Sequence, residues 1–473
     1  MSFTTRCAYP LLEALQEQLG VERYRFHVPA HTASGNFWSR YDLTELPGLD
    51  HLFAPRGSIA RAQELAAAVF QADRTYFLVN GSSAGLAAAI AALCRAGQSI
   101  VLSRHCHRSV AAGLIVSGAK PLFLPAPEDE FGIPAGPTSA QVEAVLSGLT
   151  AAPAALLVTS PNYWGISCNL PAIADCARRA GIPLLVDEAH GGHFIFHEDM
   201  PTGAAPAGAS LWVNSAHKTL GALTPGAYLH LRQNGTVDLD RLEAALALFQ
   251  TSSPPYPVLL SLDLVRGRLH EQGREIFAEA LHTARQARRQ FDLLRRFCCL
   301  EQADLPADCS LDPLRLTVRW ADAAINGFRL YNSLHQKHRV ALEMAGARYL
   351  VAIIHPGAPE KAVPALINAL QEAEKTAVSG PLSGITGPYP IPEQRMTPRE
   401  AVDAPARRVS WREAAGAVSA QLVTPFPPGV PVLYPGEEIS GELLERLAAD
   451  LRQGVHFQDL EPAAPESIRV VSV

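Results

Sequence analysis

The chain has 473 residues, of which 48% are hydrophobic and 18% charged, so its composition predicts a compact globular protein rather than a disordered one. At typical domain sizes, this length accommodates two or three domains. The formal net charge of -6 argues against a general binder of nucleic acids or of anionic membranes. The basic run at residues 285–296 is typical of one solvated helix face.

The cysteines and the hydrophobicity profile favour a cytoplasmic protein. The eight cysteines include no C-x-x-C pair, and Cys298 and Cys299 are adjacent, which suits neither a zinc site nor a disulfide framework. A reducing cytosol is the simplest setting for them. The first twenty residues lack the apolar core of a signal peptide. The longest apolar run, residues 86–94, is too short to cross a bilayer, so we expect no membrane partner.

The first half of the chain predicts an α/β fold. Residues 1–70 are expected to hold a short helix, an arm rich in Pro, His and Gly, and a helix over Ile59–Phe70. From about residue 75, short apolar runs alternate with Ala-rich helical patterns, which indicates a mainly parallel sheet with helices on both faces. The expected strands are 75–80, 99–103, 121–125, 155–160, 183–189, 211–215 and 227–231, and the expected helices include Ala84–Arg95, Ser139–Ser147 and Leu170–Ala180.

The second half predicts a smaller unit and a tail. A long helix is expected over Leu259–Phe297, after the Pro-rich break SSPPYP. Residues 312–375 contain two strand patterns, 314–320 and 349–355, and two helical patterns, Phe328–Lys337 and Lys361–Lys375. In the tail, helices are expected at Trp411–Val418 and Gly441–Gln453. The predicted domains are 1–265 (arm and large domain), 266–375 (long helix and small α/β domain), 376–400 (a linker rich in Pro, Gly and Ser) and 401–473 (C-terminal domain).

Polar residues follow four of the expected strands, where ligands of open α/β sheets bind. They are Gly81, Ser82 and Ser83 at the start of a helix, His107 after 99–103, Asp187 at the end of the apolar residues 183–186, and Lys218 just after 211–215. Taken singly, each has a structural interpretation: an ordinary helix N-cap, a structural histidine, an aspartate satisfied by backbone or solvent, and a surface lysine. Together they match the needs of pyridoxal phosphate (PLP): an amine for a covalent bond, a buried carboxylate with a cationic partner, and N–H and hydroxyl groups for a phosphate.

Two other motifs suggest functions that the rest of the sequence does not support. Residues 187–190 spell DEAH, a string known from helicases, but the chain has no G-x-x-x-x-G-K-[ST] phosphate loop. His190, His193 and His197 do not have the H-E-x-x-H spacing of a zinc site, so we expect no metal.

The residues at 215–220, SAHKTL, resemble the lysine-attachment motif of the Orn/Lys/Arg decarboxylases, which are PLP enzymes of fold type I. Further motifs follow in the family's order over nearly the whole chain: FHVPAHTASG, RGSIARAQELAAAVF, FLVNGSSAG, RHCHRSV, SPNYWG, VDEAHGGHF, TSSPPYPVLLSLD and PFPPGVPVLYPGE. The length resembles the short biosynthetic-type members. The resemblance implies a fold-type I PLP-dependent transferase large domain, a small α/β domain and a C-terminal α+β extension.

The resemblance also implies a role for each matching residue. Lys218 would hold PLP covalently, Asp187 would pair with the pyridine nitrogen, and His107 would stack on the ring. The other implied contacts are Ser82, Ser83, Ser215 and His217 for the phosphate, to which Gly81 is added by its position, His190 beside the 3′ oxygen, Ala189 against the ring face, Thr251 at the phosphate of a neighbouring subunit, and Glu437 beside the distal cation of the substrate. The role of Thr251 implies a homodimer, or a higher even oligomer, with shared active sites.

The implied activity is α-decarboxylation of a basic amino acid to its amine in polyamine metabolism. The short form favours arginine over lysine or ornithine. Either Lys218 or His217 would give the proton to Cα. Pro225 stands where the family has Gln, and Ala30 and Thr32 stand in the arm where the family reads P-G-H-K. These departures are expected to leave the PLP-binding residues untouched, although they bear on the substrate.

Two alternatives stay open at this point. An aminotransferase or lyase on the same fold would need an arginine for the substrate carboxylate, and the C-terminal part contains Arg395, Arg399, Arg407, Arg408 and Arg412. A non-catalytic regulator that binds PLP is the other alternative, and the departures at 30, 32 and 225 motivate it.

Overall fold

The computed structural model describes residues 8–20, 28–29, 31, 37–322, 324–375 and 388–472. Ala30, Thr32 and residues 376–387 of the predicted linker lie outside the described residues. The chain divides into two compact units: unit 1 is Met1–Leu93, Ala154–Ser160 and Leu170–Phe277, and unit 2 is Cys94–Pro153, Pro161–Asn169 and Ala278–Val473. The predicted domain boundaries divide the chain differently and stay predictions.

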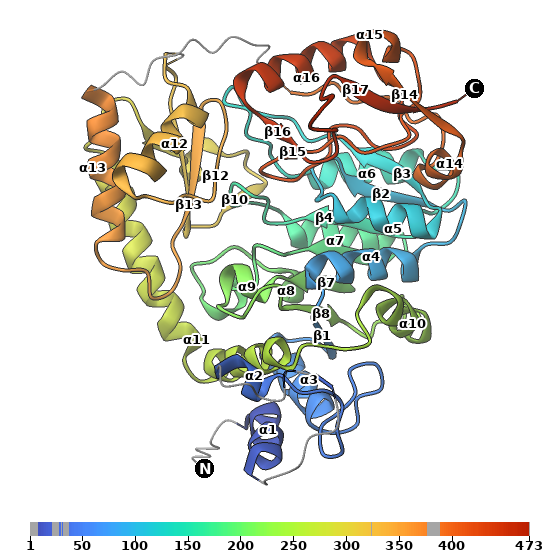
Figure 1. Cartoon of the computed structure of the whole chain (residues 1–473), viewed down its shortest axis with the longest axis vertical. Coiled ribbons are helices and arrows are strands. Elements are labelled where there is room, and N and C mark those ends of the chain that lie inside the picture. The colour runs from blue at the N-terminus through green and yellow to red at the C-terminus, as the bar shows by residue number, and fades with distance from the viewer. Residues whose placement is uncertain are drawn as a thin grey trace. The chain divides into compact units, whose positions relative to one another are not determined.

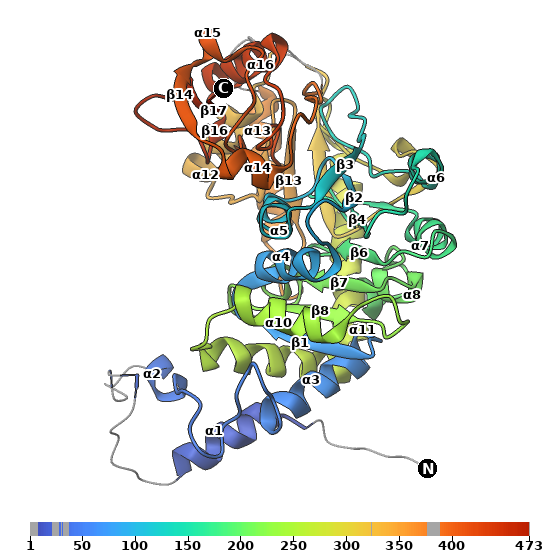
Figure 2. The same ribbon diagram turned by 90° about the vertical axis from the view of Figure 1, so that its right-hand side faces the viewer.

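Unit 1 is built on five strands in the order β1-β8-β7-β6-β4. The three strands β4, β6 and β7 run parallel, whereas β8 is antiparallel to β7 and β1 is antiparallel to β8. Figure 2 shows helices α4 and α10 on one side of these strands and α7 and α8 on the other. The strands are β1 Arg74–Leu78, β4 Leu156–Thr159, β6 Leu184–Asp187, β7 Leu211–Asn214 and β8 Ala227–Leu231.

The burial of these strands explains their sequences. Every residue of β4, β6, β7 and β8 is buried, as expected where helices cover both faces of a sheet. The helices of unit 1 are α1 Pro10–Gly20, α2 Phe37–Tyr41, α3 Ser58–Val69, α4 Gly81–Leu93, α7 Leu170–Arg179, η1 Phe194–Phe196, α8 Ala204–Ala207, α9 Ala216–Thr219, α10 Leu239–Phe249 and the first part of α11 Tyr256–Phe291.

Unit 2 holds the parallel pair β2 and β3 and a four-stranded antiparallel sheet, β12-β13-β11-β9. A separate core in the C-terminal part packs α16 against β14 and β17 (Figure 1). The strands are β2 Ser99–Ser103, β3 Lys120–Leu124, β5 Ile166–Cys168, β9 Cys298–Cys299, β10 Cys309–Leu311, β11 Arg315–Arg319, β12 Met344–Ala345, β13 Tyr349–Ile353, β14 Ala406–Ser410, β15 Pro425–Phe426, β16 His456–Phe457 and β17 Ser467–Val471.

The helices of unit 2 match most of the expected patterns. They are α5 Ser109–Ser117, α6 Ser139–Gly148, the end of α11, η2 Gln302–Asp304, α12 Gly327–His338, α13 Ala362–Lys375, α14 Pro398–Asp403, α15 Trp411–Ala414 and α16 Gly441–Gln453. The expected helix over Trp411–Val418 is wrong in its second half. It ends at Ala414 because Ala415 is extended and Gly416 has φ +78.

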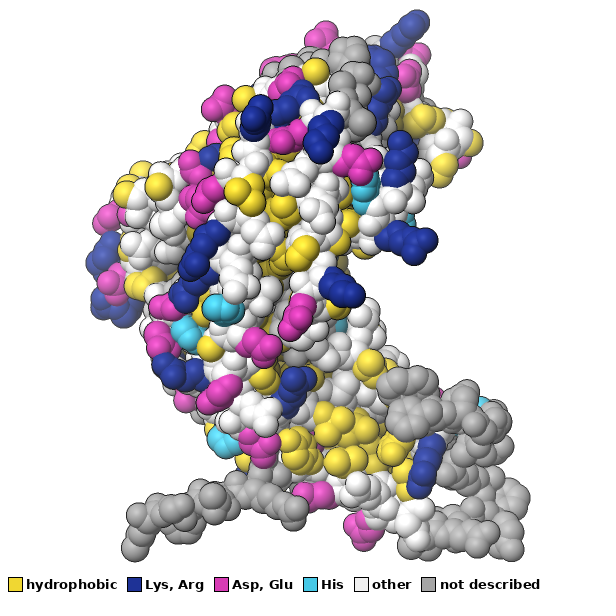
Figure 3. All heavy atoms as spheres, turned by 90° about the vertical axis from the view of Figure 1, so that its left-hand side faces the viewer, with side chains coloured by type: hydrophobic (Ala, Val, Ile, Leu, Met, Phe, Trp, Pro, Cys, Tyr) yellow, Lys and Arg dark blue, Asp and Glu magenta, His cyan; other side chains and the backbone are white. Residues whose placement is uncertain are grey.

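The basic run at 285–296 lies at the end of α11 and just after it. Arg285 and Arg289 are exposed, whereas Arg288 and Arg296 form ion pairs with Glu301 and Asp322. On the face shown in Figure 3, Lys and Arg side chains alternate with Asp and Glu. The run is therefore only partly a solvated helix face, because the Arg288 side chain is 12% exposed and residues 292–296 lie beyond the end of α11. No helix among the described residues is both long and apolar enough to cross a bilayer.

Candidate active site

Lys218 lies where two parallel strands of unit 1 end. β7 ends at Asn214, and Ser215 caps the short helix α9, which carries Lys218. The Nζ atom of Lys218 is 3.1 Å from Nε2 of His190, which follows β6 and is 4% exposed. Because β6 and β7 are parallel neighbours, their carboxyl ends bring the lysine and the histidine together.

Asp187 is the last residue of β6 and is 2% exposed. Its Oδ1 accepts a hydrogen bond from the backbone N–H of Ala189 at 3.2 Å, and Ala189 itself is buried. Burial raises the pKa of Asp187, while the Lys218 charge and the Ala189 N–H act to lower it. A buried carboxylate of this kind is stabilised by a cationic partner.

The N-terminus of α4 forms the third part of the site. Gly81 begins this helix with φ +81, and the hydroxyl of Ser215 donates to that of Ser82 at 2.7 Å. The first N–H groups of a helix have no partner inside it and therefore attract anions. Ser82 and Ser215 are buried, whereas Ser83 is exposed.

Pro225 lies against this helix start. A Cβ atom placed on Gly81 would be 3.6 Å from both the Cβ and the carbonyl oxygen of Pro225. Pro225 is therefore close to Gly81, and the expectation that it leaves the PLP-binding residues untouched stays a prediction. The loop that carries Pro225 also contacts His217, because Gly226 accepts hydrogen bonds from the backbone N–H of His217 and from its Nδ1, each at 3.1 Å.

His217 is held as a neutral ring. Burial lowers its pKa, the hydrogen bond to the Gly226 carbonyl opposes this shift, and the Lys218 charge adds to it. With Nδ1–H donated to the Gly226 carbonyl, the proton of the neutral ring is on Nδ1.

Glu188 is a residue that the sequence interpretation missed. It is 4% exposed, and its Oε1 accepts from the Ala204 N–H at 2.7 Å. Its Oε2 and its carbonyl accept from Nδ2 of Asn214, at 2.9 and 3.0 Å. Glu188 therefore ties the ends of β6 and β7 together, beside Asp187 and Ser215. The signal in the sequence was a second acidic residue after an apolar strand.

The residues of unit 1 fit PLP. An amine, a buried carboxylate and a helix N-terminus with paired serine hydroxyls lie in one unit. At the end of β4, the hydroxyls of Thr159 and Ser160 are buried without a hydrogen-bond partner, and Thr159 is opposite Asp187 in register. Such groups are costly unless a ligand or water satisfies them.

His107 and Glu437 belong to unit 2. Nδ1 of His107 is 2.8 Å from the Ser109 hydroxyl, at the start of α5, and Gly429 lies against its ring. A Cβ on Gly429 would be 3.6 Å from Cδ2 of His107. The stacking of His107 on the cofactor ring stays a prediction.

Glu437 forms a buried ion pair with Arg104. The carboxylate is fully buried and accepts from both terminal nitrogens of Arg104, one of them at 3.1 Å, and from the Tyr434 N–H at 2.7 Å. Arg104 also donates to the Val432 carbonyl at 2.9 Å. The carboxylate does not face open space, so these contacts favour a structural role, and its expected contact with a substrate stays untested.

The remaining predicted residues have ordinary surroundings. Thr251 lies between α10 and α11, where its N–H donates to the Asn80 side chain at 3.2 Å. Its predicted role towards a neighbouring subunit stays a prediction. His193 packs against the rings of Phe194 and Phe277. Among the described residues, no group of three His, Cys, Asp or Glu side chains could hold a metal ion.

Comparison with known proteins defines the family. Residues 9–305 match the model described as Orn/Lys/Arg decarboxylase, major domain, and residues 388–455 match the model of the C-terminal domain. The chain belongs to the Orn/Lys/Arg decarboxylase family. The predicted family, its dependence on PLP and its activity as an amino-acid decarboxylase are thereby confirmed, and the alternatives of an aminotransferase and of a non-catalytic regulator are set aside.

Some curated relatives of this decarboxylase match nearly its whole length, and others match only part of it. The protein named arginine decarboxylase in Bacillus subtilis is 32% identical over 98% of this chain and 97% of its own. The lysine decarboxylase LdcA of Pseudomonas aeruginosa is 26% identical over 61% of this chain and 43% of its own. Among solved structures, the Francisella novicida lysine decarboxylase LdcF has a TM-score of 0.84 at 19% identity, and the match covers 98% of this chain and 81% of that one. This similarity confirms the predicted fold class.

Proposed function

We propose that this enzyme decarboxylates arginine to its amine, in polyamine metabolism in the cytoplasm, as a homodimer with shared active sites. The observation that carries the reaction is the contact between Lys218 and His190 beside the buried Asp187. The preference for arginine rests on full-length similarity to relatives named arginine decarboxylase, which exceeds the partial similarity to LdcA.

Each residue of the site would have its own role in the proposed reaction. When bound, PLP supplies an electron sink for the pair left on Cα as CO2 departs. Asp187 would keep a positive charge on the pyridine nitrogen, because a buried carboxylate favours a cationic partner. Gly81, Ser82 and Ser215 would hold the phosphate at the N-terminus of α4. The strand-end position would keep water away from the substrate carboxylate, which favours loss of its charge.

The described contacts favour Lys218 as the proton donor to Cα. His217 carries its ring proton on Nδ1 and donates it to the Gly226 carbonyl, so it has no second proton to give while neutral. His190 is within hydrogen-bond distance of Lys218 Nζ and could accept or return a proton there.

A substrate panel tests the proposal. Release of CO2 is measured with arginine, lysine and ornithine, and arginine is expected to give the highest kcat/KM. Lys218→Ala should lose the visible absorbance of the bound cofactor and reduce turnover at least ~1000-fold. Lys120→Ala, an exposed lysine at the start of β3, is the control and should behave as wild type. A preference for lysine or ornithine would refute the arginine assignment.

A further inference from the structure

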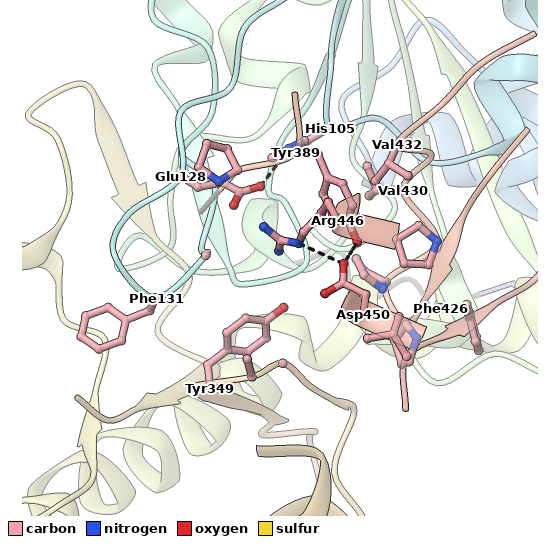
Figure 4. Close-up of a pocket in the computed structure, with 18 of the residues that line it drawn as sticks. His105, Glu128, Phe131, Tyr349, Tyr389, Phe426, Val430, Val432, Arg446 and Asp450 are labelled. Carbon is pink, nitrogen blue, oxygen red and sulfur yellow. Dashed lines mark hydrogen bonds and ion pairs between the residues drawn. The ribbon is translucent and has the colours of Figure 1, made fainter. Parts of the chain in front are cut away.

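Unit 2 contains a cavity of about 720 Å³, a volume typical of ligand sites. None of the predicted PLP or substrate residues lines it. The β3–α6 loop, the segment after β12, residues 388–391, the Pro-rich loop 425–432 and α16 form its walls (Figure 4).

The walls are largely apolar and rich in rings. Aromatic side chains come from separate segments, and aliphatic residues of the Pro-rich loop also line the cavity. The lining includes Phe131, Trp164, Phe328, Tyr331, Tyr349, Tyr389, Phe426, Val430 and Val432. Phe426 is 48% exposed, so this part of the wall faces solvent. Surfaces of this kind favour a ligand with a flat apolar body.

Most charges in the wall are already compensated. Asp450 accepts from Nε of Arg446 at 3.0 Å and from the Tyr389 hydroxyl. Arg104 is paired with Glu437. These ion pairs contribute no net charge to the cavity.

Glu128 is different. Its side chain is 11% exposed. The charge of Arg446 acts on it and lowers its pKa, but among the described residues no lysine or arginine is close enough to form an ion pair with it. Its neighbour is His105, with Nε2 3.6 Å from the carboxylate, and burial lowers the pKa of His105 to about 4, so the ring is neutral at pH 7. Figure 4 shows Glu128 and His105 side by side in the wall. The cavity therefore carries one uncompensated negative charge when Glu128 is ionised.

We propose that this cavity binds a singly charged organic cation with a flat apolar body, whose ammonium group is held by Glu128. Charge complementarity selects the cation, since an anion or a neutral ligand would leave the buried carboxylate without a partner. The rings of the wall would pack on the apolar body and add cation–π attraction. This site is separate from the proposed reaction and does not depend on it.

The probe is N,N-dimethylbenzylamine, because a tertiary amine cannot form an imine with the cofactor. Titration calorimetry on the holoenzyme is done at pH 8, since burial raises the pKa of Glu128 to about 7 and the carboxylate is then mostly ionised. Saturable binding of one molecule per chain is expected. Benzyl methyl ether, a neutral analogue of similar shape, and phenylacetate, an anion, should bind at least 10-fold more weakly.

Variants localise the binding. Glu128→Gln keeps the shape of the side chain and should weaken binding of the amine at least 10-fold, while binding of the ether is unchanged. Phe426→Leu, on the exposed rim, should weaken both probes. Glu130→Gln changes an exposed neighbour outside the cavity and serves as the matched control. The proposal is overturned if the wild type shows no saturable binding, if Glu128→Gln binds the amine as tightly as wild type, or if the ether binds as tightly as the amine. A second copy of the chain filling the cavity would also give no binding and thus overturn it.

Discussion

At the scale of single residues, the site depends on side chains whose burial sets their ionisation. Asp187 and Glu188 are adjacent buried carboxylates at the end of β6 with different partners. The sequence indicated Asp187 as a candidate because PLP chemistry demands a carboxylate at a strand end, and the structure places it, buried, at the end of β6. The sequence marked Glu188 only as a second acidic residue after an apolar strand. The contacts of Glu188 could not be predicted, since its partners, Asn214 and Ala204, lie 26 and 16 positions away and are brought close only by the fold.

Glu188 makes stability depend on pH. Burial raises its pKa to about 7, above the ordinary value of 4.5. The folded state therefore binds this proton more tightly than the unfolded state does, and ionisation costs stability. The contribution of protonated Glu188 to the free energy of unfolding is largest below pH 4.5. It is lost as pH rises from 4.5 to about 7, and the total loss is about 3 kcal/mol.

The variant Glu188→Gln should remove this pH dependence. Its amide oxygen can still accept from the Ala204 N–H, but its NH₂ group faces Nδ2 of Asn214, so we expect a loss of about 1–2 kcal/mol at pH 5. Thermal midpoints of the holoenzyme between pH 5 and 8 should fall less steeply than those of wild type. Glu445→Gln, an exposed residue of α16, is the control. Parallel curves for Glu188→Gln and wild type would contradict the assignment.

At the scale of elements, all seven strands expected in the first half of the chain are present, because strands buried on both faces give continuous apolar runs. Helices α5 and α10 were missed, and α11 begins at Tyr256 and ends at Phe291 rather than spanning Leu259–Phe297. The Arg104–Glu437 pair could not be predicted, since its residues are 333 positions apart. Nothing in the sequence around either residue indicates that the other is its partner.

Helix α11 anchors α1 through a buried ion pair. Asp263 and Arg266 are 0% and 1% exposed and contact each other. Asp263 also accepts from the Leu11 N–H at 3.1 Å, and Arg266 donates to the Ala8 carbonyl at 2.8 Å. Within unit 1, the pair therefore holds the start of α1 against α11; both helices are labelled in Figure 2.

Breaking one side of this pair should be costly. Asp263→Ala leaves the Arg266 charge buried without its counter-ion and is expected to lower the free energy of unfolding by about 3–5 kcal/mol. The double variant Asp263→Leu, Arg266→Met removes both charges and should regain most of that loss. Urea denaturation followed by tryptophan fluorescence measures both, and the exposed Arg268→Ala provides the baseline. Equal instability of the single and double variants would show that the hydrogen bonds to α1 dominate instead.

At the scale of the whole molecule, the proposed shared active site predicts subunit complementation. If Thr251 serves the partner's phosphate site, Thr251→Ala and Lys218→Ala impair the same site of a mixed dimer, and the other site keeps both residues. Co-refolding of the two variants in equal amounts should restore about a quarter of wild-type activity, because half of the dimers are mixed. Activity no higher than the average of the two separate variants would place Thr251 in its own subunit's site.

The Pro-rich loop 425–432 has a consequence for inhibitor design. It borders the cavity at Phe426 and Val430, while Gly429 lies on the His107 ring and accepts from the Arg108 N–H at 3.0 Å. A compound that binds in the cavity and displaces this loop would disturb His107. It would need neither to resemble an amino acid nor to react with the aldehyde of PLP. Such a compound would spare the many other enzymes that share the same vitamin-derived cofactor.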